Sequence, residues 1–330
     1  MAFVGVDVSK RRFDVAWLRD AENDKVKTRV FDNTPDGFER FGQWLEKHTG
    51  QSIRECHVMM EATGIYHEAL AYWLYEAGSR VYVKNPAHVR AFAKSWGRRS
   101  KNDRKDSVII ARFLESRRHR QWQPEPPEVR QLKALLSRLH ALSDDIVREE
   151  NRLEKARIQN ASKIVSDSIR SMIRQLKAER ERLVEQIDDH FDQHPKLNQD
   201  RKRLETIPGI GPALSREIIA IIRSRDFKKA RELAAFVGTV PIYEDSGDTV
   251  RGASRLNKIG PGRFRAKLYM ATVVAKQHNP SVKAHYERMR ARGKAPMSAL
   301  GAAMRKLVHI AFGVVKNQCD YQPEGALKTA

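Results

Sequence analysis

The chain has 330 residues, of which 41% are hydrophobic and 8% aromatic, enough to form two or three domains with buried cores. The excess of Lys and Arg (62) over Asp and Glu (41) gives a formal net charge of +21, which suits a polyanionic partner because each neutralised phosphate releases counterions. Cys56 and Cys319 lie far apart with no Cys or His at metal-ligand spacing beside them, which excludes a disulfide framework and a zinc finger. Nucleic acid is therefore the expected partner, although a basic chain also gains solubility from its charge.

The sequence offers no signal for export or membrane insertion. The apolar run that begins at Met1 meets Asp7 and is too short for a signal peptide. No uninterrupted run of about 18 apolar residues exists elsewhere. We therefore expect a cytoplasmic protein that has no membrane partner.

The first part of the chain predicts an α/β domain over residues 1–122. Short segments rich in Val and Phe, separated by charged turns, predict three antiparallel strands, and the apolar spacing that follows predicts alternating helices and strands. This order of elements is that of the RNase H fold. The expected elements are strands Phe3–Val8, Phe13–Leu18 and Val26–Phe31, helix Asp36–Lys47, strand Cys56–Met60, helix Ile65–Ala77, strand Arg80–Lys84, a helix from Pro86 and helix Asp103–Glu115.

A coiled-coil linker is expected over residues 123–195. The segment Pro124-Glu125-Pro126-Pro127 breaks regular structure and indicates a domain edge. Because the heptads that follow are imperfect, an ordinary helical spacer and a dimerisation device both remain open. The apolar stripes run through Leu132, Leu136, Leu139, Ile146 and Leu153 and, after a break near Ala161, through Ile169, Met172, Leu176, Leu183 and Ile187.

The last part of the chain predicts a mostly α domain over residues 196–330. The segment Ile207-Pro208-Gly209-Ile210-Gly211 lies between two helical patterns and resembles a helix-hairpin-helix turn. Its glycines, Gly209 and Gly211, would let backbone N–H groups approach a phosphate without reading sequence. A plain turn between packed helices is the alternative. A helix through Met304 and Ile310 and a frayed tail over residues 322–330 complete the domain.

Four acidic residues form the candidate metal site. Asp7 lies within the first strand, where a carboxylate is unfavourable unless a cation offsets its desolvation, and Glu61 ends a strand that runs beside the first one in an RNase H fold. Asp103 and Asp106 share a face at the start of one helix. Taken one at a time, each acid also has a purely structural interpretation. Glu61 would be a solvated strand end, Asp103 a helix N-cap, and Asp106 a residue favoured by the helix dipole. Together these oxygen ligands predict a site for Mg²⁺ or Mn²⁺.

Basic residues accompany the acids and a candidate serine. Those near the acids would attract a nucleic-acid backbone or, alternatively, form a solvated loop; they are Arg98, Arg99, Lys101, Arg104 and Lys105. Ser246 precedes Gly247 in a basic stretch, where cations would stabilise the charge that develops when a serine attacks phosphorus. Ser-Gly is also a common turn dipeptide, and Ser254 has an equally basic setting, so chemistry alone does not choose the nucleophile. The basic neighbours are Arg251, Arg255 and Lys258.

Six motifs follow one another along nearly the whole chain. They are Gly5-Val6-Asp7-Val8-Ser9-Lys10, Glu61-Ala62-Thr63-Gly64-Ile65-Tyr66, Asn85-Pro86, Lys101-Asn102-Asp103-Arg104-Lys105-Asp106, Ile207-Pro208-Gly209-Ile210-Gly211, and Ser246-Gly247 through Lys258. As an ordered set they resemble the DEDD transposases of the insertion-sequence one-ten family, relatives of the Piv invertases. One departure is the basic pair between the two aspartates, where the family pattern has smaller residues.

The resemblance implies a RuvC-like N-terminal domain, a coiled-coil linker and a C-terminal transposase domain. It also implies four catalytic metal ligands, Asp7, Glu61, Asp103 and Asp106, and a nucleophilic serine, Ser246, with Ser254 in reserve. The expected partners are double-stranded donor and target DNA, a structured bridge RNA that pairs with both, and further copies of the chain in a dimer or tetramer. Members of this family combine the RuvC-like domain of one subunit with the serine domain of another.

We therefore expect a DNA recombinase that exchanges strands through a phosphoserine intermediate. A Holliday-junction resolvase or RNase H-type nuclease, in which water attacks, would share the acids but leave hydrolysed ends. A non-catalytic nucleic-acid scaffold would bind through its basic surfaces and break no strand in Mg²⁺.

Overall fold

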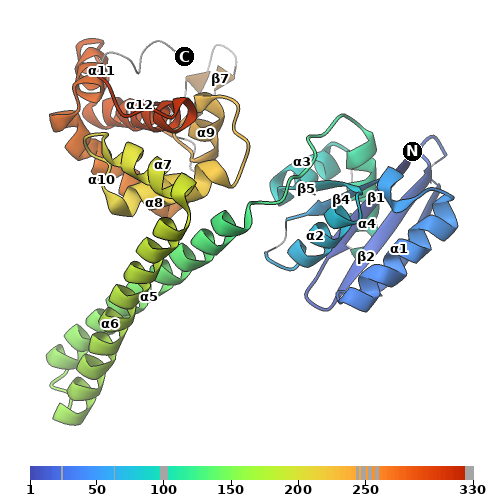
Figure 1. Cartoon of the computed structure of the whole chain (residues 1–330), viewed down its shortest axis with the longest axis horizontal. Coiled ribbons are helices and arrows are strands. Elements are labelled where there is room, and N and C mark those ends of the chain that lie inside the picture. The colour runs from blue at the N-terminus through green and yellow to red at the C-terminus, as the bar shows by residue number, and fades with distance from the viewer. Residues whose placement is uncertain are drawn as a thin grey trace. The chain divides into compact units, whose positions relative to one another are not determined.

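A computed structural model describes residues 1–23, 25–62, 64–96, 103–242, 245–246, 250–251, 255–256 and 260–323. The chain divides into two compact units, residues 1–124 and 125–330 (Figure 1). The three-part division expected from the sequence separates the long helices from the C-terminal domain, whereas here both belong to the second unit. Some residues singled out from the sequence lie outside the described residues: Arg98, Arg99, Lys101, Ser254 and Lys258.

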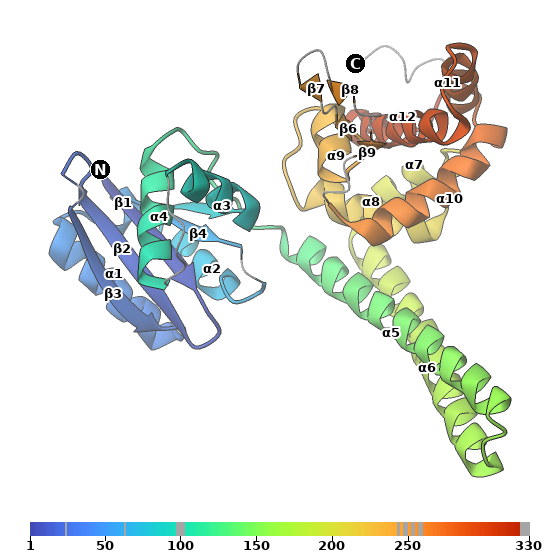
Figure 2. The same ribbon diagram turned by 180° about the vertical axis from the view of Figure 1, so that it is seen from behind.

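The first unit is a five-stranded mixed sheet with helices on both faces (Figures 1 and 2). Its elements are β1 (Ala2–Val8), β2 (Arg12–Asp20), β3 (Lys25–Asp32), α1 (Pro35–Thr49), η1 (Ile53–Glu55), β4 (Cys56–Glu61), α2 (Glu68–Glu76), β5 (Arg80–Lys84), α3 (Pro86–Ser95) and α4 (Asp103–Glu115). The strand order is β3-β2-β1-β4-β5, with β1 antiparallel to β2 and parallel to β4. The predicted order of strands and helices is confirmed.

Most predicted boundaries agree to within two residues, and the largest difference lies at the start of the helix after β4. The helix expected from Ile65 begins at Glu68, because residues 64–67 form a turn. Gly64 adopts a positive φ of 57°, a conformation that glycine reaches without strain. Residues 64–67, after β4, therefore form a loop rather than the start of a helix.

Two apolar cores cover the two faces of this sheet. On one face Val4, Val6 and Val8 pack with α1 and α2. On the other, Met59 and Tyr82 pack with α3 and α4. Because side chains alternate along a strand, each interior strand contributes side chains to both cores. The two layers fix which face each charged strand residue occupies.

The second unit is mostly helical, as predicted. Its helices are α5 (Pro127–Ile158), α6 (Lys163–Gln193), α7 (Pro195–Glu205), α8 (Pro212–Arg223), α9 (Ala230–Phe236), α10 (Gly262–His278), α11 (Pro280–Ala291) and α12 (Pro296–Asn317). Two short antiparallel ladders were not expected: β6 (Pro241–Ile242) pairs with β9 (Arg255–Leu256), and β7 (Asp245–Ser246) pairs with β8 (Val250–Arg251).

Helices α5 and α6 form a long antiparallel hairpin (Figures 1 and 2). Of the predicted apolar stripe, Leu132 and Ile187 are fully buried, but Met172 is 46% exposed and its neighbour Ile173 is buried instead. The prediction for Met172 is therefore wrong by one helical position, because imperfect heptads leave the facing residue ambiguous. At the tip, Ile158 and Ile164 are largely exposed.

A buried carboxylate joins the hairpin to the C-terminal helices. Glu217 of α8 is almost fully buried and accepts a hydrogen bond of 2.8 Å from Nε2 of His140 on α5. It also forms an ion pair with Lys267 of α10. One side chain thus connects three helices, and removing Lys267 would leave the buried carboxylate without its ion-pair partner.

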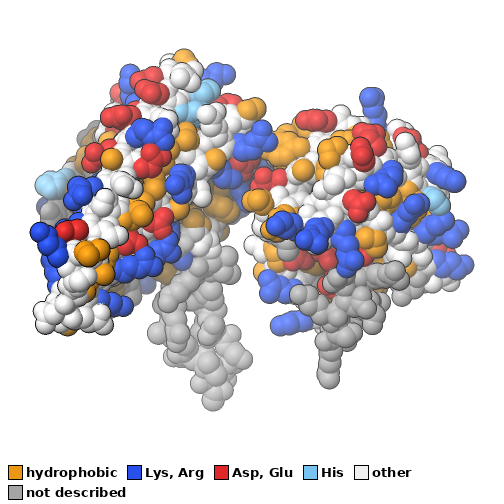
Figure 3. Space-filling model, turned by 90° about the horizontal axis from the view of Figure 1, so that it is seen from below, with side chains coloured by type: hydrophobic (Ala, Val, Ile, Leu, Met, Phe, Trp, Pro, Cys, Tyr) orange, Lys and Arg blue, Asp and Glu red, His pale blue; other side chains and the backbone are white. Residues whose placement is uncertain are grey.

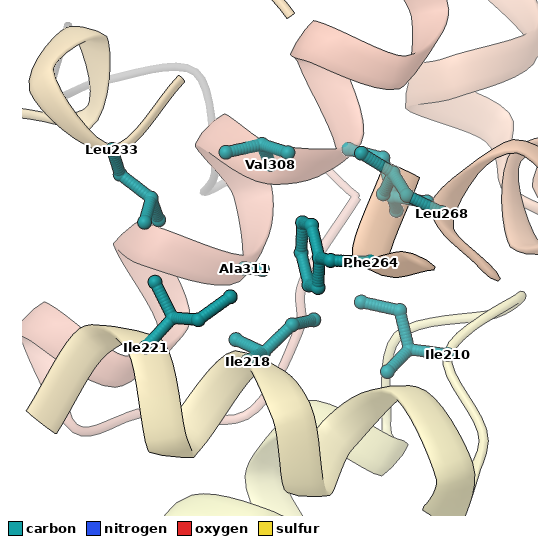
Figure 4. A pocket seen from close by; sticks show the side chains of 9 residues that line it. Ile210, Ile218, Ile221, Leu233, Phe264, Leu268, Val308 and Ala311 are labelled. Carbon is teal, nitrogen blue, oxygen red and sulfur yellow. The ribbon is translucent and has the colours of Figure 1, made fainter. Parts of the chain in front are cut away.

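Helix α12 is the central helix of this unit. Its length and apolar composition would allow a membrane span, but two thirds of its most apolar stretch is buried inside the protein, as in the core helix of a globular domain. Beside it lies a small pocket lined only by apolar side chains, including Phe264, Ile218 and Val308 (Figure 4). A pocket without polar groups offers nothing to a phosphate or a metal ion.

Candidate functional site

A row of charged residues crosses four neighbouring strands of the sheet. Asp7 of β1 pairs directly with Asp14 of β2, and Glu61 of β4 pairs with Lys84 of β5. The parallel register joins Val6 of β1 to Met60 of β4, so one further step places Asp7 beside Glu61. Neighbours in such a row are spaced by the strand separation, about 5 Å, and lie on one face of the sheet.

This row lies on the face that α4 covers. The valines on either side of Asp7, Val6 and Val8, belong to the core on the opposite face. Met59, two residues before Glu61, belongs to the core beneath α3 and α4. Because side chains alternate along a strand, Asp7 and Glu61 both face α4.

Gly5 allows α4 to lie directly on β1. A Cβ atom at Gly5 would lie 2.1 Å from the carbonyl oxygen of Ser107 and 2.3 Å from the backbone nitrogen of Ala111, so no larger residue fits there. Ser107 is fully buried and follows Asp106. The contact therefore fixes the first turns of α4, with their two aspartates, above the strand that carries Asp7.

Two members of the row were missed by the sequence reasoning. Asp14 is only 8% exposed, so a second carboxylate lies buried beside Asp7. Lys84 is half-buried, and burial, with a smaller contribution from the charge of Arg117, lowers the pKa of its ammonium group. Strand register could have identified them, because pairing β1 with β2 and β4 with β5 places Asp14 and Lys84 in the row.

The donor chemistry of the row suits a hard divalent cation. Asp7 and Glu61 are half-buried carboxylates in neighbouring positions, and close like charges favour a bound cation or a raised pKa. Among the residues whose side chains the structure describes, no three Asp, Glu, His or Cys residues form a metal-binding group. The side chain of Asp103 is outside that description, while its backbone begins α4, one helical turn before Ser107.

Asn33 ties together the two loops that follow the acidic strands. Its Nδ2 donates 3.0 Å hydrogen bonds to the carbonyl oxygen of Ser9, after β1, and to that of Tyr66, in the loop after β4. His67, at the end of this loop, is 9% exposed, and burial lowers the pKa of its imidazole. Asn33 thus positions the ends of the strands that carry Asp7 and Glu61.

Replacing Asn33 with Ala should destabilise the first unit by about 2 kcal/mol, because two hydrogen bonds of roughly 1 kcal/mol each are lost. Urea unfolding of the full chain measures the change. Asn23→Ala is the matched control, because Asn23 hydrogen-bonds to Asp20 in an exposed turn. Equal stability of the two variants would show that Asn33 does not hold the loops.

The two glycines of the predicted hairpin turn differ in their surroundings. Gly209 has a φ of 101°, and a Cβ there would lie 2.7 Å from the carbonyl oxygen of Ala271 and from the Cβ of Ala275, both on α10. Packing against α10 therefore accounts for Gly209. Gly211, the N-cap of α8, has open space where a Cβ would lie. Of the two, Gly211 has room for a nearby phosphate.

The candidate serine lies in the β7–β8 ladder. Ser246 pairs with Val250, and Asp245 with Arg251, so Ser246 and the basic strand after it are neighbours along the backbone. Arg255 lies in β9, and Arg104 and Lys105 lie in the first turn of α4. Lys and Arg side chains are spread over both units on the face that Figure 3 shows, in keeping with the net charge of +21.

Two family models match the chain, one over the first unit and most of α5 and one over the C-terminal helices. A model described as "Transposase", for the DEDD transposases of IS110, matches residues 4–156, and a model described as "Transposase IS116/IS110/IS902 family" matches residues 201–287. The first contains the charged row and α4. The second contains the hairpin turn, the ladder with Ser246 and α10.

Curated proteins with similar sequences agree with these matches. The pilin gene-inverting proteins of Moraxella bovis and Moraxella lacunata are each 29% identical over 316 residues, covering 95% of both chains. An insertion element IS110 protein of 43.6 kDa from Streptomyces coelicolor is 23% identical over 48% of this chain and 38% of its own length.

The protein is thus an enzyme that acts on DNA as a transposase or recombinase, with a mixed α/β N-terminal sheet and a mostly helical C-terminal region. The predicted resemblance is confirmed. The chain belongs to the IS110 family of transposases.

Proposed function

We propose that this transposase cleaves and exchanges DNA strands through a covalent phosphoserine intermediate formed by Ser246, at a site that needs Mg²⁺ or Mn²⁺. The observation that carries the proposal is the register that brings Asp7 and Glu61 together beneath α4. The strand order β3-β2-β1-β4-β5, with the last two strands parallel to β1, favours an RNase H-like, specifically RuvC-like, fold for this unit.

Four carboxylates would hold the metal: Asp7, Glu61, Asp103 and Asp106. A bound divalent ion would polarise the scissile phosphate and stabilise the charge on the leaving oxygen. Lys84, beside Glu61, adds a positive charge at the edge of the row. Basic residues of α4, Arg104 and Lys105, are proposed to attract the DNA backbone to this edge.

Ser246 is proposed to attack phosphorus directly. A bond forms between its Oγ and phosphorus, one bridging P–O bond of the DNA breaks, and the leaving oxygen takes a proton to become a hydroxyl. A DNA 3′-hydroxyl later attacks the phosphoserine, restoring both the phosphodiester and the serine. The phosphoryl group thus stays covalently held, and no free double-strand end is released.

The expected partners follow from the family. We propose double-stranded donor and target DNA, a structured guide RNA, and assembly with further copies of the chain. Ile158 and Ile164, at the tip of the α5–α6 hairpin, are largely exposed apolar side chains. They support a coiled-coil contact with a second copy, because such a contact would remove them from water. The turn before α8, with Gly211 open, supports a helix-hairpin-helix contact with phosphate.

The nucleophile is tested by trapping covalent protein–DNA adducts with Ser246→Ala beside the wild type in Mg²⁺. The adduct should disappear in this variant, because alanine offers no oxygen for attack, and persist in the control Ser254→Ala. Denaturing gels with labelled DNA measure it. Undiminished adduct in Ser246→Ala would exclude this serine, and hydrolysed ends without any adduct would favour a nuclease that uses water.

A further inference from the structure

Two helices near the C-terminus share a cluster of basic side chains, which we call the α11–α12 cluster. Its members recur at helical spacing on each helix, so each helix presents them on one side. They are His285, Arg288 and Arg292 of α11 and Arg305, Lys306 and His309 of α12.

The two halves of the cluster face each other. Helices α11 and α12 pack together (Figures 1 and 2). A terminal guanidinium nitrogen of Arg288 lies 3.0 Å from Nδ1 of His285 on the same helix. Between the helices, Arg288 acts electrostatically on Lys306, and Lys306 acts on His285. The cations therefore lie within electrostatic range of one another.

Among the described residues, the cluster lacks the acidic partners that several other cations of this unit have. Elsewhere in the unit, Asp188 pairs with Arg216 at 2.6 Å, and the fully buried Asp200 pairs with Arg223 at 2.6 Å. Within the described part of the chain, no ion pair joins a carboxylate to any cation of the cluster. Glu287 is the single acidic residue of the sequence between Pro280 and His309.

Partial burial makes this accumulation of charge unfavourable. Burial first, and then the charge of Arg288, lowers the pKa of Lys306. Burial and the neighbouring cations likewise lower the pKa of His285 and of His309. In addition, Nε2 of His309 is buried with no hydrogen-bond partner among the described residues. An anion between the helices would relieve the repulsion of the cations.

We propose that the α11–α12 cluster binds the phosphodiester backbone of a nucleic acid, as a contact separate from the carboxylate row. Arginine suits this ligand because its planar fork can donate two hydrogen bonds to one phosphate, and lysine adds a point charge. Such contacts position a duplex or a folded RNA without reading its sequence. The proposal rests on the proposed function only in taking nucleic acid as the polyanion.

The test compares the double variant Arg288→Gln/Lys306→Gln with the wild-type full chain by fluorescence anisotropy over a range of salt concentrations. The probes are a 30-base-pair DNA duplex and an RNA hairpin of mixed sequence. The control Arg170→Gln/Arg182→Gln removes the same charge from exposed ion pairs on α6. Arg288→Lys/Lys306→Arg keeps both charges and reports on folding, together with thermal unfolding of every variant.

The cluster variant should bind roughly tenfold more weakly at 100 mM salt, and its slope of log K against log[salt] should fall by about 2, one for each lost phosphate contact. A loss for only one probe identifies DNA or RNA as the polymer. Affinity and slope equal to those of the control for both probes would overturn the proposal. Binding does not require chemistry, so Ser246→Ala protein that binds normally would separate failure of this proposal from failure of the proposed mechanism.

Discussion

Replacing Asp7 with Asn should lower the rate of DNA strand cleavage in Mg²⁺ by at least about 1000-fold. The change keeps the size of the side chain but removes the negative charge beside Glu61, and with it a ligand of the proposed ion. Several kcal/mol of transition-state stabilisation by a divalent ion corresponds to this factor. Cleavage of a labelled DNA substrate, followed in time with Mg²⁺, Mn²⁺ or EDTA, measures the effect.

The matched control is Asp36→Asn, which removes an acid from the first turn of α1. It should cleave at close to the wild-type rate. Because Asp7 lies in a strand between two others, folding of both variants is checked by circular dichroism. Cleavage by Asp7→Asn at the wild-type rate in EDTA would dismiss the metal site and leave the transposase assignment without its proposed chemistry.

Replacing Gly5 with Ala should destabilise the first unit by about 1–3 kcal/mol and reduce cleavage. The added methyl group would meet the backbone of α4 at 2.1 Å, and a backbone atom cannot turn aside as a flexible side chain can. The helix must move away from β1, and Asp106 moves with it. Urea unfolding and the cleavage assay together measure the loss of stability and of activity.

Gly313→Ala provides the opposite expectation from the same chemical change. Gly313 lies within α12, and no atom of another described element lies within 4 Å of the place that a methyl group would take. Alanine should therefore leave stability unchanged or raise it by up to about 1 kcal/mol through helix propensity. If Gly5→Ala and Gly313→Ala unfold at the same urea concentration, the close contact between α4 and β1 does not hold in solution.

Much of the first unit could be predicted from local patterns. A short segment rich in Val and Phe identified β1, and the apolar spacing of Phe38 and Phe41 identified α1, because both patterns follow from burial in a core. The association of Asp7 with Glu61 required only that two predicted strands be neighbours. The order of elements supplied that condition.

The remaining features depend on contacts between distant segments. Asp14 and Lys84 become part of the row only through strand register, which a single strand does not encode. The need for glycine at position 209 arises from Ala271 and Ala275 of α10, which lie more than sixty residues later in the sequence. The ladder that contains Ser246 consists of two-residue strands, which are too short for any periodic pattern.

The bond between Glu217 and its two partners has a mechanical consequence for the α5–α6 hairpin. Since α5 has 32 residues and an α-helix rises 1.5 Å per residue, the hairpin extends for roughly 48 Å. Because His140 of α5 is hydrogen-bonded to the buried Glu217 of α8, which is itself paired with Lys267 of α10, the hairpin is attached as a stiff arm rather than as a flexible tether. A small rotation of the hairpin about this attachment would therefore displace its distant tip, and any second molecule bound there, by a large distance.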